Sequence, residues 1–391
     1  MGMLVQFGAG NIGRSFIGQL FSRGGYEVVF VDINKPVIDA MNERREYRLI
    51  VKRNEIPDET VLIKNVRGIL ASDADAVAEA LSHARIAATA VGQNALTHIL
   101  PTIAKGLVLR MERNGGPLDI ILAENIRNGA AFVRKSLAAM LPSSFDLDSI
   151  GLVETSIGKM VPLMREEDMR VDPLWVFAEE YNNLIVDTRA FRNPIPDIPG
   201  IAPKENMAAY VDRKLFIHNL GHAAAAYAGF AEDPSRTLIW QVLELPNVAT
   251  HVRSAMQESA QALMKEYPGE FTEKALADHI DDLIMRFRNK ALGDTVFRVG
   301  RDLKRKLGKD DRLIGALLLA VKHNIDCPAT IKTVHDAMRF RAKDERGEFF
   351  PADKVIIENE FPKGIRSVLM SMSGLSEADK NEKRVLDLAE K

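Results

Sequence analysis

The chain has 391 residues, of which 46% are hydrophobic and 27% are charged, and its formal net charge is −2 at pH 7. This length predicts two domains with full hydrophobic cores. The near balance of charge argues against a general binder of nucleic acids or acidic membranes. The single cysteine, Cys327, excludes a disulfide framework or a thiolate metal cluster, and no apolar run approaches the roughly 18 residues of a membrane span.

The N-terminal segment combines an apolar strand, a glycine-rich turn and a helix. The strand begins at residue 3, which leaves no room for a signal peptide, so we expect a cytoplasmic protein. The turn has the pattern G-x-G-x-x-G, in which the first glycine permits the tight turn, the second lets a pyrophosphate approach the backbone and the third lets helix and strand pack closely. The helix N-terminus then faces the phosphates with its free N–H groups. The predicted cofactor-binding residues are Gly8, Ala9, Gly10, Asn11, Ile12 and Gly13.

An aspartate at the end of the second strand completes this pattern. Residues 27–31 form a predicted strand, and Asp32 follows it, 19 positions after Gly13. A carboxylate at this position can accept hydrogen bonds from both ribose hydroxyls and repels a 2′-phosphate. The segment therefore predicts a dinucleotide site that prefers NAD to NADP, whereas a glycine turn kept only for packing would not explain Asp32.

Strands and helices alternate through the first half of the chain, which predicts a parallel, doubly wound sheet of the Rossmann type. We expect helices at 35–45 and 74–81, and strands at 47–51, 61–63, 86–91, 118–123 and 150–157. Ligands of such sheets bind beyond the carboxyl ends of the strands. Gly92 and Asn125 are therefore cofactor-site candidates and Glu124 is a substrate-site candidate, although a helix cap explains Asn125 equally well.

A proline-rich segment separates two kinds of sequence. Residues 193–203 contain four prolines in eleven positions, a density that ends regular structure and stiffens the chain. We therefore expect a Rossmann-type dinucleotide-binding domain at 1–195 and a mostly α-helical substrate and catalytic domain at 196–391. Helical apolar spacing predicts helices at 207–228, 236–243, 248–264, 272–287, 311–323 and 331–341, and a charged surface helix in the tail, 376–391.

One segment of the second domain carries a lysine, an amide and two histidines. On an α-helix, at about 100° per residue, Lys214, His218 and His222 lie about 40° apart and Asn219 lies about 60° beyond His222, so one side of the helix holds all four. This arrangement suits a general base flanked by hydrogen-bond donors. From these residues alone, a lysine that reaches solvent and two histidines of the core explain the pattern as well.

A basic cluster occurs further along the chain, at Arg298, Arg301, Lys304, Arg305, Lys306, Lys309 and Arg312, with aspartates interleaved. A solvated, salt-bridged surface is the usual explanation of such a pattern. However, Arg298 and Lys306 are eight positions apart and would share one side of a continuous helix. They could clamp an anionic or polyhydroxylated substrate.

These motifs together resemble the polyol-specific long-chain dehydrogenases, the mannitol dehydrogenase family, nearly from end to end. The matching segments include F-G-A-G-N-I-G-R at 7–14, K-x4-N-x2-H at 214–222 and R-V-G-R at 298–301. The resemblance implies that Lys214 is the general base, that Asn219 polarises the reacting oxygen and that His222 binds the substrate. It also implies substrate contacts by Arg298 and Lys306. His218 lies outside the motif, and we expect it either to pack or to support the residues that contact the substrate.

The resemblance further implies reversible, metal-independent hydride transfer between NAD and a sugar alcohol, with mannitol 1-phosphate and fructose 6-phosphate as the expected pair. A sugar-acid reductase of the fructuronate or tagaturonate type and an enzyme for an unphosphorylated polyol are the alternatives. The chain departs from the family signature V-D-R-I-x-P at Gly158-Lys159, a change that bears on sugar specificity. We expect small-molecule ligands only, no nucleic acid or membrane partner, and a monomer or weak homodimer.

Two other classes of protein share some of these features. The 6-phosphogluconate and 3-hydroxyacid dehydrogenases also join a nucleotide fold to helices and use a lysine–asparagine pair, but their spacing is K-x3-N and this chain has K-x4-N. An NAD-binding regulator without turnover would need no lysine held in a cleft. Absence of NADH oxidation with ketoses, ketose phosphates and uronates would favour the regulator.

Overall fold

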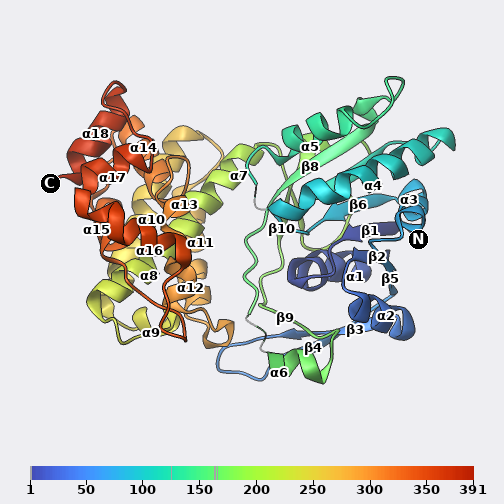
Figure 1. Ribbon diagram of the computed structural model, residues 1–391, viewed down its shortest axis with the longest axis horizontal. Helices are drawn as coiled ribbons and strands as arrows, with labels where there is room; N and C mark the ends of the chain where they lie inside the picture. The colour runs from blue at the N-terminus through green and yellow to red at the C-terminus, as the bar shows by residue number, and fades with distance from the viewer. Residues whose placement is uncertain (1, 125, 163, 165) are drawn as a thin grey trace. The chain divides into compact units, whose positions relative to one another are not determined.

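A computed structural model describes residues 2–124, 126–162, 164 and 166–391, so the predicted site residue Asn125 lies outside the described residues. The chain forms two compact units, Met1–Met207 and Ala208–Lys391 (Figure 1). This division at 207/208 comes later in the chain than the boundary expected at 195/196. The reason is that the chain after the prolines still adds a strand, β11 (Ile201–Lys204), to the sheet of the first unit.

The first unit is built on an eight-stranded sheet with the order β11-β10-β8-β7-β6-β1-β2-β5. The remaining strands are β1 (Met3–Phe7), β2 (Glu27–Asp32), β5 (Val66–Leu70), β6 (Ile86–Thr89), β7 (Leu118–Leu122), β8 (Ile150–Ser156) and β10 (Leu184–Asp187). The strand pairs are parallel except β8 with β10. β1 pairs with β2 on one side and β6 on the other, so the strand order reverses beside β1, where ligands of such sheets bind. The predicted doubly wound sheet is confirmed.

Both faces of this sheet are covered, which is why its strands are apolar on both sides. The helices α3 (Ala74–His83), α4 (Gln93–Glu112) and α5 (Gly129–Ala138) pack on one face with Val5 and Phe7, whereas α1 (Gln19–Arg23) and α2 (Lys35–Arg44) pack on the other face with Leu4 (Figure 1). α4 and α5 were not among the predicted helices.

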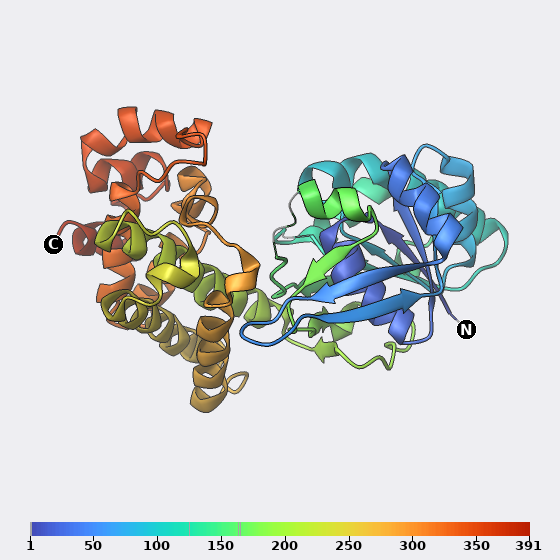
Figure 2. The same ribbon diagram turned by 90° about the horizontal axis from the view of Figure 1, so that it is seen from below.

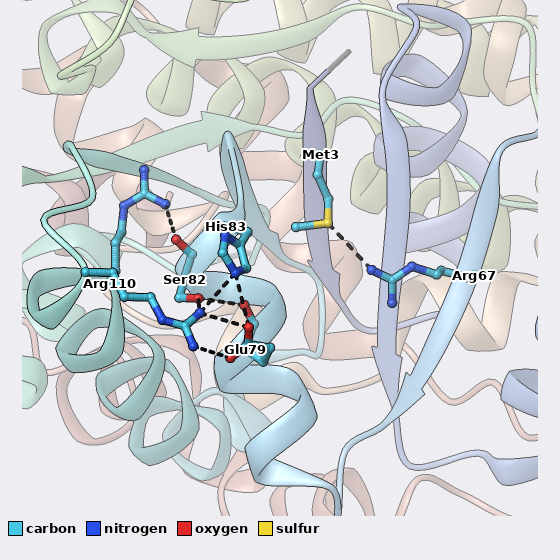
Figure 3. Close-up of polar contacts among 7 residues, drawn as sticks. Met3, Arg67, Glu79, Ser82, His83 and Arg110 are labelled. Atoms are coloured by element: carbon cyan, nitrogen blue, oxygen red, sulfur yellow. Dashed lines mark hydrogen bonds and ion pairs between the residues drawn. The ribbon is translucent and has the colours of Figure 1, made fainter.

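Arginines tie α3 to α4 at the surface of the first unit (Figure 3). Arg110 donates to the carbonyl oxygens of Ser82 at 3.1 Å and Ala84 at 2.8 Å. Arg113 donates to both carboxylate oxygens of Glu79 at 2.8 Å. These contacts hold the two helices in register on the sheet.

The predicted polar strands at 47–51 and 61–63 exist, but they build a second sheet. β3 (Glu46–Val51) pairs with β4 (Glu59–Lys64) and with β9 (Val176–Ala178), and the long β3–β4 hairpin is seen in blue in Figure 2. The Tyr47 hydroxyl donates to the carbonyl oxygen of Arg14 at 2.6 Å, so this small sheet braces the helix that follows the glycine-rich turn.

The second unit is helical, as predicted. Its first helical stretch is α7 (Met207–Arg213), the π-helix η4 (Lys214–Asn219) and α8 (Leu220–Glu232). The further helices are α9 (Ile239–Val242), α10 (Pro246–Glu266), α11 (Glu273–Phe287), α12 (Val296–Gly300), α13 (Leu303–Lys306), α14 (Ile314–Lys322), α15 (Pro328–Arg339), α16 (Pro351–Asn359), α17 (Ile365–Ser371) and α18 (Lys380–Ala389). α8 is the central helix, and nine of its thirteen residues are buried.

The tail of the chain is better anchored than its charge suggested. α18 buries Val385, Leu386 and Ala389 and packs against α14 and α15, so the predicted surface helix is amphipathic and docked. Among the residues that the structure describes, no helix has the length and apolar character needed to cross a membrane.

Candidate active site

The glycine-rich turn after β1 has the geometry that its motif predicts. Gly8 has a φ of +92°, which favours glycine, and a Cβ added to Gly13 would lie 1.9 Å from the carbonyl oxygen of Gly8. Gly10 is different, because an added Cβ there would meet nothing within 4 Å. The turn therefore leaves open space beside the Gly10 backbone, as the approach of a pyrophosphate requires.

Asp32 ties the turn to β2. Its Oδ2 accepts a hydrogen bond from the Ala9 N–H at 2.6 Å, and its Oδ1 accepts one from the Asn34 N–H at 2.8 Å. Each carboxylate oxygen keeps a further lone pair, so Asp32 can also accept from ribose hydroxyls. Of the other predicted cofactor-binding residues, Asn11 is exposed and Ile12 is half-buried.

A buried carboxyl group connects the end of β6 with the segment that follows β7. Glu124, after β7, accepts a hydrogen bond from the Thr89 hydroxyl at 2.5 Å and one from the Val91 N–H at 3.1 Å. Burial raises the pKa of Glu124. Both oxygens thus hold the chain that leads into Gly92, which has a φ of +85° and caps α4. Besides its predicted role as a substrate contact, Glu124 anchors this edge of the first unit.

In the second unit, the predicted general base, Lys214, occupies a partly buried position. Lys214 is half-buried on η4, and its burial, together with the nearby guanidinium of Arg312, lowers its pKa to about 8. At that pKa an appreciable fraction of the amine is neutral near physiological pH. Lys214 therefore has the proton affinity of a general base.

His222, near the start of α8, packs against an aromatic ring. Its ring stacks on Phe287 at 4.7 Å between centroids with an interplanar angle of 7°. Nε2 lies 3.2 Å from Asp294 Oδ2, at ion-pair distance, but it makes no aligned hydrogen bond to any described residue. Burial and the charge of Arg298 lower the His222 pKa to about 3, so the ring is neutral at pH 7. A buried ring nitrogen with unused hydrogen-bonding capacity suits a substrate hydroxyl.

His218 packs as expected. It is buried against Phe287, with ring centroids 5.6 Å apart, and its pKa is well below the usual range, first because of burial and then because of the Arg286 charge. The ring is neutral and fills the space between η4 and α11.

Arg298 and Lys306 lie in separate short helices, so the condition under which they would share one side of a continuous helix is not met. α12 and α13 are interrupted at Asp302, which has a φ of +68°. The carboxylate of Asp353 accepts hydrogen bonds from the N–H groups of Asp302 and Leu303, both at 2.8 Å, and stabilises the break. This contact comes from a distant part of the chain, so helical spacing could not reveal it.

The cations nevertheless gather near His222. Arg298 pairs with the buried carboxylate of Asp294. Lys306 is buried and donates to the carbonyl oxygen of Arg301, and burial and the Arg312 charge lower its pKa to about 7. The charges of Arg298, Arg312 and Lys306 all act on the His222 pKa. The outer members of the basic cluster form other ion pairs: exposed Arg305 pairs with Asp302, and half-buried Lys309 pairs with the buried carboxylate of Glu382.

Three further residues near His222 and the basic cluster were not predicted as site residues. Phe287 supports both histidines, Asp294 contacts His222 and Arg298, and Arg312 acts on Lys214, His222 and Lys306. Arg312 belonged to the basic cluster and Asp294 to the aspartates interleaved with it, and this pattern of charges gave only a weak signal. Nothing in the apolar spacing of α11 distinguished Phe287 from a core residue.

The departure at Gly158-Lys159 has a structural explanation. Lys159 Nζ donates to the carbonyl oxygens of Glu179 at 3.1 Å and Tyr181 at 2.7 Å, and to Asn182 Oδ1 at 3.2 Å. It also lies 5.2 Å from the centre of the Phe16 ring. Lys159 thus fastens the segment after β8 to the segment after β9.

Within the part of the chain that the structure describes, no three or more histidine, cysteine, aspartate or glutamate side chains are arranged to hold a metal ion. The fold and the glycine-rich turn are those of a dinucleotide-binding protein. The family model of the mannitol dehydrogenase Rossmann domain matches residues 3–200, and that of the mannitol dehydrogenase C-terminal domain matches residues 206–378. The chain therefore belongs to the mannitol dehydrogenase family and is an NAD-dependent polyol dehydrogenase.

Solved structures have the same fold across the whole chain. A D-sorbitol dehydrogenase in substrate-free form is 16% identical with a TM-score of 0.78, and the match covers 99% of this chain and 92% of that one. The Pseudomonas fluorescens mannitol 2-dehydrogenase, in a ternary complex with NAD and D-mannitol, is 15% identical with a TM-score of 0.74, and the match covers 100% of this chain and 90% of that one.

Proposed function

We propose that the chain is a mannitol-1-phosphate 5-dehydrogenase, which interconverts mannitol 1-phosphate and fructose 6-phosphate with Lys214 as the general base. The observation that carries the chemistry is the lysine whose pKa is lowered to about 8 by burial and by Arg312. A lysine in water has a pKa of about 10.4 and is a poor base at neutral pH. Cytoplasmic activity at neutral pH fits this lowered value.

In the oxidative direction, the C–H bond of the secondary alcohol breaks and NAD accepts its electron pair as hydride. Lys214 takes the proton of the hydroxyl group, so the O–H electrons form the carbonyl bond. The Asn219 amide donates to the reacting oxygen as negative charge develops there. The neutral ring of His222 hydrogen-bonds a substrate hydroxyl and stays uncharged through the reaction.

The cations near His222 support a phosphorylated substrate. Arg298, Arg312 and Lys306 concentrate positive charge around the proposed substrate residues, with Asp294 and Asp311 as counter-charges. A guanidinium binds phosphate bidentately, and Arg298 retains N–H donors beyond its contact with Asp294. An unphosphorylated polyol is the second candidate, because the structurally similar mannitol 2-dehydrogenase was solved with D-mannitol.

The test compares kcat/KM for fructose 6-phosphate, fructose and fructuronate, each with NADH, in the native chain and in Arg298→Ala. We expect a strong preference for fructose 6-phosphate that shrinks about ten- to a hundredfold in Arg298→Ala, because a hydrogen bond to a charged group contributes roughly 1.5–3 kcal/mol. Arg305→Ala is the matched control, since Arg305 pairs with Asp302 and Asp311 at the surface. Equal use of fructose and its phosphate, or a preference for fructuronate, would contradict the phosphate assignment.

A further inference from the structure

The spacing of the proposed base and amide poses a geometric problem. Lys214 and Asn219 are five positions apart, and at about 100° per residue an α-helix would turn their side chains about 140° away from each other. One side of an α-helix can hold both groups, but a separation of about 140° sets them at its opposite edges, where they converge poorly on one hydroxyl. A regular α-helix is therefore a poor scaffold for this pair.

The structure resolves the problem by widening one turn. Residues Lys214–Asn219 form a π-helix, and the Leu220 N–H donates to the carbonyl oxygen of Leu215, five residues earlier. The backbone stays helical on both sides, with φ −56° and ψ −45° at Arg213 and φ −64° and ψ −52° at Leu220. The turn thus absorbs an additional residue while the helix continues from α7 into α8.

A π turn changes which side chains share a side of the helix. Because its hydrogen bonds reach five residues back, each residue advances by roughly 80° instead of 100°, so five steps place Asn219 about 40° from Lys214. With the next three residues at about 100° each, His222 lies about 20° from Lys214 on the other side, and the four polar residues span about 80° of arc instead of about 140°. The influence of Arg312 on both Lys214 and His222 agrees with this common direction.

Packing in the second unit holds the widened turn in place. Three consecutive side chains, Phe216, Ile217 and His218, are buried. Phe216 lies against α14 at Gly315, where an added Cβ would come within 2.8 Å of the ring, and His218 lies against Phe287. The π turn is therefore part of the packed core of this unit.

We propose that this π turn is the device that positions the base and the amide, making K-x4-N here equivalent to the K-x3-N spacing of an α-helix. On an α-helix, residues four apart lie about 40° from each other, close to the value that the π turn provides. The inference rests on the proposed roles of Lys214 and Asn219. It adds that the backbone geometry, and not the residue count, is what the chemistry requires.

A matched pair of variants tests this. Deleting Leu215, the one side chain of residues 215–218 that is not fully buried, creates K-x3-N and lets the segment become α-helical. Inserting one alanine after Leu215 creates K-x5-N, which neither an α turn nor a single π turn aligns. We expect the deletion to keep kcat within about tenfold of the native value, with a rate that still rises with pH. The insertion should lower kcat at least about a hundredfold, the scale of losing one oxyanion donor.

Folding of both variants is checked by a cooperative thermal transition, with a lowered Tm expected because the turn is packed in the core, and NADH titration should match the native value because the predicted cofactor residues belong to the first unit. A folded deletion variant without activity, or an insertion variant as active as the native chain, would overturn the inference. If either variant fails to fold, a crystal structure of the native protein decides, since a bond from the Leu220 N–H to the Phe216 carbonyl oxygen would remove the π turn and the proposal with it. Failure of the proposed function is distinguishable, because the native chain itself would then lack turnover.

Discussion

The glycine-rich turn of the first unit and the lysine segment of the second unit solve different problems with a similar backbone. Each contains a π-helical turn, Gly13–Gly18 in the first unit and Lys214–Asn219 in the second. In the first, glycines lie at both ends, and a Cβ on Gly18 would lie 2.8 Å from the Gly13 carbonyl oxygen. In the second, large buried side chains surround the turn.

This difference separates two kinds of recognition. The first region depends on glycines, because the lack of a side chain lets a phosphate approach the backbone N–H groups. The second depends on ionisable side chains whose proton affinity is changed by burial and by neighbouring cations. Substitutions should therefore act sterically on cofactor binding in the first region and electrostatically on turnover in the second.

The largest effect is expected for Lys214→Ala. Loss of a general base typically costs about 10²–10⁴ in rate, and the substitution should leave NADH binding unchanged because the predicted cofactor residues lie in the first unit. Steady-state kcat and an NADH fluorescence titration measure the two effects. Lys309→Ala, which removes the ion pair with Glu382, is the control. Activity within threefold of the native chain would remove Lys214 from the mechanism.

Substitutions at two glycines of the first unit distinguish an effect on folding from an effect on cofactor binding. Gly13→Ala places a Cβ 1.9 Å from the Gly8 carbonyl oxygen, so the turn must distort, and both Tm and NADH affinity should fall. Gly10→Ala meets no protein atom within 4 Å, so its Tm should stay near the native value while NADH affinity drops about tenfold or more, since the methyl group occupies the space of the phosphate. Unchanged NADH affinity in Gly10→Ala would place the cofactor elsewhere.

The pH profile should report the second region alone. Neutral Lys214 accepts the proton, so polyol oxidation should rise with pH through about 8, whereas ketose reduction needs the protonated amine and should fall over the same range. Arg312→Gln removes a nearby positive charge and should move the midpoint to higher pH. A midpoint that Arg312→Gln leaves in place would show that the charge of Arg312 does not lower the Lys214 pKa.

At Asp32 the expected effect is on the choice between the two cofactors. Asp32→Ala should lower kcat/KM with NAD by about ten- to a hundredfold and raise the relative use of NADP, because hydrogen bonds to a carboxylate are lost along with its repulsion of a 2′-phosphate. The native preference for NAD over NADP is the baseline. A Tm measurement controls for the lost contact with the Ala9 N–H. An unchanged cofactor preference would mean that Asp32 supports only the turn.

The sequence alone predicted the fold class, the NAD cofactor and the family, because these depend on local signals. The glycine motif places its turn, strand and helix within about thirty residues of each other, and alternating apolar segments predict a covered parallel sheet. Helical spacing likewise predicted α10, α11, α14 and α15 of the second unit.

Tertiary structure decided the features that depend on contacts between distant residues. The strands β3 and β4 join β9 in a separate sheet, because Tyr47 and Leu49 bury against the other elements of that unit. The helix break at Asp302 is stabilised by Asp353, fifty-one positions away. The π turn of residues 214–219 is held by packing against α11 and α14, whereas a count of 100° per residue assumes an unstrained α-helix.

The pKa values of the proposed site residues also depend on contacts between residues that are distant in the sequence. Lys214 and Arg312 are 98 positions apart, yet their proximity and burial in one unit lower the lysine pKa to about 8. A sequence lists the charges but not the water removed from around them, and desolvation is the first cause of each large pKa shift at Lys214, His222 and Lys306. The residue types were therefore readable from the chain, whereas their ionisation was decided by the packing of the second unit.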